Sequence, residues 1–141
     1  MNNIDFFKLQ AKNFLKDYNN RIFDQSCEPG IWTHPNPKFF NDIDEIIMDY
    51  DIDEDKPFSL MNAQHIIAQM AGFRNWRDLL SASDDRLELG KLILIELKKD
   101  YFSEATEVYD WFSFGIRDIH GNLMECDDST LLDIFKARYC Q

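Results

Sequence analysis

SLMNAQHIIAQMAGFRNWRDLLSA, residues 59–82, is the stretch of the chain that specifies a tertiary motif by itself. Ser59 stands at the N-cap position of a helix, and Gly72 supplies the left-handed residue that ends it. The apolar positions between them recur at helical spacing: Leu60, Ala63, Ile66, Ile67, Met70 and Ala71. Asn75 then caps a second helix that turns three side chains inward: Trp76, Leu79 and Leu80. We therefore expect a helical hairpin at residues 59–82.

The remaining periodicity predicts a mainly α-helical protein, a bundle of about five or six helices in a single domain, residues 1–141. Further helices are expected at 4–18, 43–50 with Asp42 as cap, 84–99, 103–114, and in a closing segment capped by Asp128 or Ser129. Residues 116–126 fit one short C-terminal β-hairpin. Residues 19–40 lack periodicity, and we expect a long irregular loop pinned by large aromatic side chains: Trp32, Phe39 and Phe40.

Composition favours a cytoplasmic protein with a packed core. Of the 141 residues, 45% are hydrophobic, and there are few helix breakers, with five glycines and four prolines. No apolar run reaches the roughly 18–20 residues that span a bilayer, and the N-terminus lacks the pattern of a secretory signal. The three cysteines share no CxxC spacing, which favours reduced thiols: Cys27, Cys126 and Cys140.

The formal charge of −11 is concentrated in one short segment. Residues 42–58, the acidic segment, hold eight acidic side chains and one lysine, a net charge of −7. Such a field repels nucleic-acid phosphates and attracts basic surfaces, although its simplest role is a solvated face that keeps the protein dissolved. The eight acids are the candidate partner-binding residues: Asp42, Asp44, Glu45, Asp49, Asp51, Asp53, Glu54 and Asp55.

Two metal sites are suggested by the residue types and then disfavoured by their spacing. The alternating acids from Asp49 to Asp53 resemble the start of a calcium loop, but Glu54 and Leu60 stand where the loop requires glycine and glutamate. Cys27 and His34 could meet Cys126 or Cys140 around zinc, but the short paired spacing of structural zinc sites is absent. We expect no metal and no cofactor.

Catalytic motifs are also absent from the sequence. It contains no GxSxG, GxxxxGK[ST], GxGxxG or HExxH pattern. A Cys–His pair assembled in space stays open as an enzymatic alternative, with Cys27, His34 and His120 as its residues. We expect a protein that is not an enzyme.

The helical hairpin at 59–82 raises the alternative of DNA binding. Ala68 and Gly72 stand four residues apart, as in DNA-binding helix-turn-helix motifs. In the second helix, however, Asp78 and Ser81 occupy positions that such motifs fill with apolar residues. The nearby arginines are offset by acids, so the surface is poorly equipped for phosphate contacts, and direct DNA or RNA binding is disfavoured.

The segment AQHIIAQMAGFRNWRDLL, Ala63–Leu80, resembles an AQ-x2-IA-x3-GF-x2-W-x-DL block of small uncharacterised bacterial helical proteins and of short helical domains near glyoxalase-like modules. The resemblance covers about 18 residues, implies a helical pair and carries no activity with it. We interpret the block as a structural clamp whose key residues are Ala68, Gly72, Phe73 and Trp76.

The sequence therefore leads to one principal hypothesis. The chain is a non-enzymatic cytoplasmic binding protein of bacterial or phage type, an inhibitor, antitoxin or immunity factor whose acidic segment engages a basic protein surface. That partner could itself be a nucleic-acid-binding protein. The alternative is a transcriptional regulator that uses the hairpin at 59–82.

Overall fold

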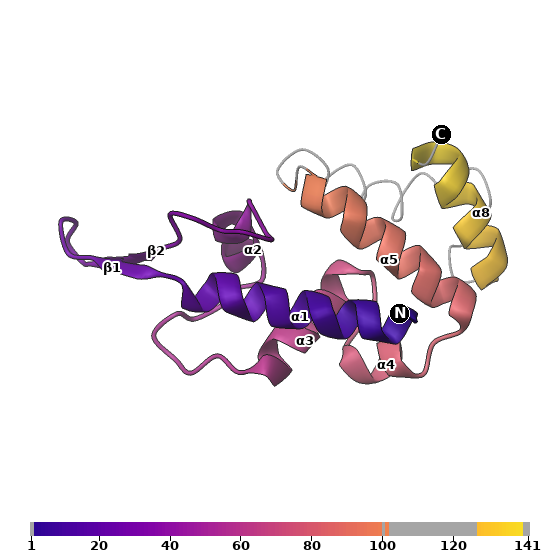
Figure 1. The fold of residues 1–141 in the computed structure, drawn as a ribbon, viewed down its shortest axis with the longest axis horizontal. Helices are drawn as coiled ribbons and strands as arrows, with labels where there is room; N and C mark the ends of the chain where they lie inside the picture. Colours follow the sequence, from indigo (N-terminus) through magenta and orange to yellow (C-terminus); the bar gives the residue numbers. More distant parts are fainter. Residues whose placement is uncertain (1, 100, 102–126, 140–141) are drawn as a thin grey trace.

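The computed structural model of the protein describes residues 2–99, 101 and 127–139, and these are mainly helical (Figure 1). Along the chain the elements are α1 (Asn3–Asn19), β1 (Ile22–Asp24), β2 (Ile31–Thr33), α2 (Ile43–Asp49), α3 (Leu60–Met70), α4 (Trp76–Leu80), α5 (Asp84–Lys99) and α8 (Asp128–Tyr139). The predicted mainly α-helical fold is confirmed. The helix expected at 103–114 and the hairpin expected at 116–126 lie outside the described residues.

The core forms where α1, α3 and α5 meet, and α8 packs along α5 at the end of the molecule away from the β-strands (Figure 1). On α1, Phe7, Ala11 and Phe14 recur at helical spacing and are fully buried. The other large side chains of the buried core include Tyr18, Phe40, Ile43, Ile46, Ile67, Leu79, Leu89, Ile93, Leu94 and Phe135. Among the described helices, none is both long and apolar enough to cross a bilayer.

The predicted turn between α3 and α4 is confirmed in detail. Ser59 and Asn62 form a capping box at the start of α3. At its end, the Gly72 amide donates to the Gln69 carbonyl at 3.0 Å, and the Phe73 amide donates to the Ala68 carbonyl at 2.9 Å. This pair of bonds is a Schellman motif, and it places Gly72 at a φ of +92°.

The second helix of the pair is shorter than the pattern suggests. Asn75 caps α4, as predicted, and Leu79 is fully buried. The prediction that Leu80 also turns inward is wrong, because 48% of this residue is exposed. Successive residues of a helix are rotated by about 100°, and α4 packs on the core through one side only, so Leu79 is buried and Leu80 is turned toward solvent.

One interaction joins the start of α5 to the start of α8. The Ser83 hydroxyl accepts the Arg86 amide at 3.1 Å and donates to Asp128 Oδ2 at 2.6 Å. The cap of α8 is Asp127, whose Oδ1 accepts the Thr130 amide at 2.7 Å. The prediction of Asp128 or Ser129 as cap is therefore wrong, because the Asp128 carboxylate bonds to Ser83 instead.

The expectation of an irregular loop at 19–40 is also wrong, because β1 and β2 pair antiparallel within it. The register aligns Ile22 with Thr33, Phe23 with Trp32, and Asp24 with Ile31. Each strand has three residues, too few to show a period of two in the sequence. This β-hairpin, residues 22–33, projects from the helical body at the C-terminal end of α1 (Figure 1).

A buried carboxylate, that of Asp17, binds the backbone of the segment that leads from the β-hairpin back to the core. Asp17 is 2% exposed, and its two oxygens accept the amides of Lys38 at 2.9 Å and of Phe39 and Phe40 at 2.8 Å. Phe40 then enters the core, as expected, with its ring 5.3 Å from that of Phe14. Phe39 is 36% exposed and contributes less to pinning the segment than predicted.

Replacing Gly72 by alanine should destabilise the fold. The residue has a φ of +92°, and an added Cβ would lie 2.8 Å from Arg86 Nη2. We expect the free energy of unfolding to fall by about 1–2 kcal/mol, measured by urea denaturation. Asn36→Ala, an exposed loop position, is the control, and equal midpoints for the two variants would contradict the prediction.

Candidate protein-binding surface

Arg21 anchors the first strand of the β-hairpin to the helical body. Its guanidinium carbon lies 3.9 Å from the centre of the Trp32 ring and 4.6 Å from that of Tyr18. Nη1 donates to the Glu54 carbonyl at 3.0 Å and lies 3.3 Å from Glu54 Oε2. The side chains of Arg21 and Glu54 are each 19% exposed, so this ion pair is shielded from solvent more than a typical surface pair.

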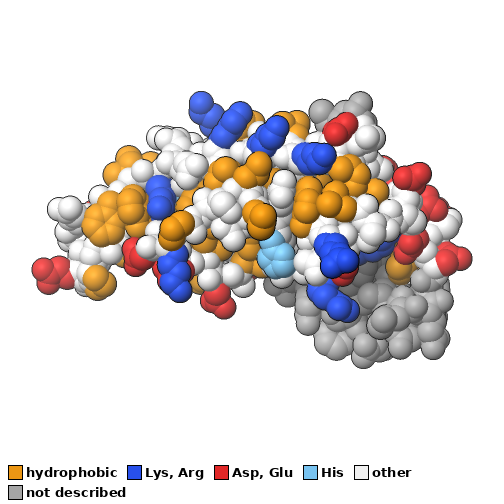
Figure 2. Space-filling model, turned by 90° about the horizontal axis from the view of Figure 1, so that it is seen from below, with side chains coloured by type: hydrophobic (Ala, Val, Ile, Leu, Met, Phe, Trp, Pro, Cys, Tyr) orange, Lys and Arg blue, Asp and Glu red, His pale blue; other side chains and the backbone are white. Residues whose placement is uncertain are grey.

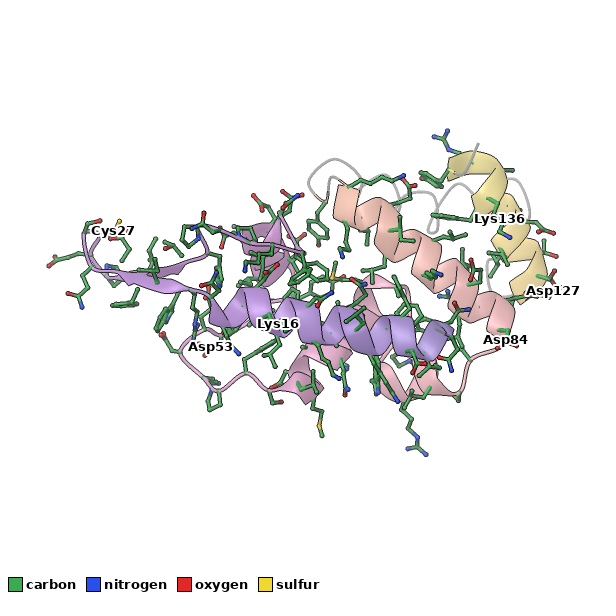
Figure 3. The ribbon with its side chains drawn as sticks, in the orientation of Figure 1. Lys16, Cys27, Asp53, Asp84, Asp127 and Lys136 are labelled. Carbon is green, nitrogen blue, oxygen red and sulfur yellow. The ribbon has the colours of Figure 1, made fainter. Side chains whose placement is uncertain are left out.

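His34 anchors the second strand in a similar way. Its side chain is fully buried, with Nδ1 2.8 Å from Asp44 Oδ1 and Nε2 3.5 Å from Glu54 Oε2. Arg21 precedes β1 and His34 follows β2, so the acidic segment holds both ends of the β-hairpin. In Figure 1, α2 and the loop leading to α3 lie on opposite sides of the C-terminal end of α1, and Figure 3 places Asp53 in that loop.

Three further acids of the segment also have partners within the chain. Asp42 occupies the N-cap position of α2, but its carboxylate makes no capping bond and accepts the Tyr101 amide at 2.8 Å. Asp49 accepts the Tyr101 hydroxyl at 2.7 Å. Burial, and then the bond to Asp49, raise the pKa of Tyr101 well above its usual range. Asp53 accepts the Asp55 amide at 3.0 Å and lies 3.7 Å from Lys56 Nζ.

The remaining three acids, Glu45, Asp51 and Asp55, make no side-chain hydrogen bond or ion pair with any residue that the structure describes. Asp51 has a φ of +51° at the end of α2, where the Ile52 amide donates to the Ile47 carbonyl at 3.0 Å. A short polar residue tolerates this left-handed position. These three acids are therefore the ones whose carboxylates have no partner among the described residues.

A large apolar side chain lies among these charges. Met48 is 73% exposed and stands on α2 three residues after Glu45, a spacing that places two side chains on one helix face. The Asp51 amide donates to the Met48 carbonyl at 3.2 Å, so Asp51 follows directly at the end of that helix. We call Glu45, Met48, Asp51 and Asp55 the acidic surface.

Sequence reasoning missed the residues that hold the β-hairpin. Glu54 lies 33 residues from Arg21, and no local pattern connects them. His34 was a candidate metal ligand or catalytic base, but it is buried between two carboxylates. The one signal in the sequence is a cation, Arg21, that stands between two aromatic residues, Tyr18 and Trp32.

The other candidate sites are not assembled in the described part of the chain. Cys27 is an exposed free thiol at the tip of the β-hairpin (Figure 3), whereas His34 is buried directly after the end of β2. Cys126, Cys140 and His120 lie outside the described residues. Within residues 2–99, 101 and 127–139, no three His, Cys, Asp or Glu side chains are grouped to hold a metal ion.

The clamp residues lie around the α3–α4 turn, near the N-terminal end of α1, whereas the root contacts of the acidic segment lie at its C-terminal end (Figure 1). Ala68 is fully buried, whereas Phe73 and Trp76 are partly buried against the core. The Phe73 ring packs edge-on against Phe7 with centroids 6.4 Å apart, and the Arg86 guanidinium lies 4.4 Å above it. These contacts agree with a structural role for the turn.

Comparison with known proteins yields no match to a family model, to a curated protein or to a solved structure. The resemblance of Ala63–Leu80 to the bacterial block therefore stays a prediction from sequence.

The shielded Arg21–Glu54 pair should matter for the β-hairpin far more than the exposed Lys56–Asp53 pair. In Arg21→Ala, Glu54 and Trp32 lose their partner, and we expect a loss of about 1.5–3 kcal/mol in stability together with faster proteolysis within 22–33. Lys56 and Asp53 are 78% and 50% exposed, so Lys56→Ala should change stability by less than about 0.5 kcal/mol. Equal losses in urea denaturation would contradict the assignment.

Proposed function

We propose that the protein is a non-catalytic interaction module that binds a basic surface of another protein through the acidic surface. The observation that carries the proposal is Met48, which is 73% exposed among acids that have no partner in the described structure. An apolar centre surrounded by charge is the usual arrangement of a protein interface, where the centre supplies affinity and the charged rim supplies partner choice.

A role in keeping the protein dissolved does not account for an exposed Met48 among the acids of the segment. Charge alone keeps a protein dissolved, and an exposed methionine between Glu45 and Asp51 adds nothing to that purpose. Five of the eight acids also make contacts within the chain, and the three without a partner among the described residues lie on α2 and in the loop after it. Opposite charge on a partner would speed its encounter with this surface and fix its orientation.

The nucleic-acid alternative receives less support from the geometry of the hairpin at 59–82. The helix α4 has five residues, about 1.4 turns, and it offers Arg77 beside Asp78 and the exposed Leu80. A recognition helix needs several side chains that reach base edges and a cationic surface for phosphates.

The proposal includes an inhibitor, antitoxin or immunity role in the cytoplasm. The exposed free thiol of Cys27 supports a reducing compartment. A net charge of −11 supports a basic target, such as a nucleic-acid-binding protein, whose own ligand is polyanionic.

Neutralising the acidic surface should reduce partner capture without unfolding the protein. In the triple variant Glu45→Gln, Asp51→Asn, Asp55→Asn, capture of basic proteins from an extract of the cells that encode the chain should fall by roughly tenfold at low salt. The measurement is quantitative mass spectrometry of the bound fraction.

The matched control is the triple variant Asp5→Asn, Asp85→Asn, Asp133→Asn, which removes the same number of exposed charges from α1, α5 and α8. It should retain wild-type capture. If both triple variants lose capture equally, the effect is one of net charge, and the acidic surface is not the binding site.

Met48 and Met61 provide a second matched pair, because they are 73% and 75% exposed. Met48→Ser should weaken capture by roughly fivefold or more, since a central apolar side chain contributes most to interface affinity. Met61→Ser, on α3, should leave capture unchanged. Both substitutions should be neutral in thermal unfolding, and identical capture by the two variants would remove Met48 from the site.

A further inference from the structure

The two faces of the β-hairpin differ in their contacts with the helical body. Side chains alternate along a strand, so Arg21, Phe23, Trp32 and His34 share a face. On that face Arg21 and His34 make the root contacts, and Phe23, which is 42% exposed, packs against Trp32 with the ring centroids 5.0 Å apart. We call it the inner face.

The outer face carries Ile22, Asp24, Ile31 and Thr33, which the register places in two facing pairs. Ile22 is 60% exposed and Ile31 is 48% exposed. Figure 2 shows hydrophobic side chains at the surface on the end of the molecule that the β-hairpin forms. Two exposed isoleucines on a projecting sheet contribute little to the core, so a role in the fold does not explain them.

The charged side chains of the β-hairpin itself, Asp24 and Glu28, are both acidic. Between residues 22 and 37 the chain contains Asp24 and Glu28 and no lysine or arginine. Asp24 Oδ1 accepts the hydroxyl and amide of Ser26 at 2.6 and 2.9 Å, and these bonds lower the pKa of the Asp24 carboxyl. Edge strands commonly carry lysine, which discourages pairing with other chains, and this β-hairpin lacks that protection.

We infer that the outer face of the β-hairpin binds a polypeptide segment of the basic partner in which apolar side chains alternate with lysine or arginine. The apolar side chains cover Ile22 and Ile31, and the cationic ones pair with Asp24 and Glu28. This inference rests on the proposed function, because the acidic segment that holds the root of the β-hairpin also carries the acidic surface.

Charge selects this occupant over the others. A second copy of the chain would bring Asp24 and Glu28 against the same acids, and each copy carries −11, so repulsion opposes a dimer through this face. Anionic lipid headgroups and nucleic-acid phosphates are repelled for the same reason. A basic polypeptide is attracted and also offers apolar side chains.

The test uses the full-length chain as bait for a phage-displayed library of random twelve-residue peptides. Peptides enriched on the wild type should combine apolar residues with lysine or arginine. Affinities of the resynthesised peptides are then measured by fluorescence anisotropy against four purified proteins: the wild type, Ile22→Thr/Ile31→Thr, Leu80→Gln, and the triple variant Glu45→Gln/Asp51→Asn/Asp55→Asn.

Threonine keeps the branched shape that suits a strand and removes the apolar surface. Ile22→Thr/Ile31→Thr should lower affinity by about tenfold or more. Leu80 is exposed to the same 48% as Ile31, and Leu80→Gln should bind within about twofold of the wild type. Resistance of residues 22–33 to proteolysis, equal to that of the wild type, shows that the β-hairpin is intact.

The remaining outcomes separate the two proposals. If Ile22→Thr/Ile31→Thr binds as the wild type does while the acidic triple variant loses affinity, the inference about the β-hairpin is overturned and the proposed function stands. If only the isoleucine variant loses affinity, the outer face is supported and the acidic surface is not. The inference is overturned if the library yields no peptides that bind the wild type better than the isoleucine variant. It is also overturned if the wild type sediments as a dimer and the isoleucine variant does not.

Discussion

The buried carboxylate of Asp17 is the constraint on which the arrangement of the N-terminal half depends. It accepts three successive backbone amides, from Lys38 to Phe40, a concave anion site made by the chain itself. Without it, the buried amide of Phe40 would have no partner, at a cost of about 1–3 kcal/mol, and the part-buried amides of Lys38 and Phe39 would lose theirs. Asp17 also acts against the lowering of the Lys98 pKa that burial causes. The carboxylate thus fixes the point at which the chain re-enters the core.

Asp17 fixes the chain after the β-hairpin, and the two ends of the β-hairpin are themselves held by contacts with the helical body. The acidic segment supplies these contacts: Glu54 pairs with Arg21, and Asp44 pairs with His34. A two-stranded sheet of this size is marginally stable alone, so its persistence rests on these root contacts. The acids of one segment therefore divide into five that make contacts within the chain and three whose carboxylates have no partner among the described residues.

The sequence predicts those parts of the fold that local rules determine. Ser59, Gly72 and Asn75 set helix boundaries through bonds within a few residues, so the hairpin at 59–82 could be read directly. The β-hairpin could not, because Arg21 and Glu54 meet only after the chain has folded. The same limit applies to the candidate site: eight acids were equivalent in sequence, and only tertiary contacts show which of them are already used.

The root contacts also affect what the surface can bind. The acidic segment carries the acidic surface and also contacts Arg21 and His34. These contacts fix the position of the β-hairpin relative to α2. A preordered pair of contact regions loses little conformational entropy on binding, so modest contacts suffice for affinity. Charge repulsion among the outward acids opposes a compact state, and the inward pairs offset it. Binding of a basic partner would relieve that repulsion, which couples occupancy of the surface to stability of the fold.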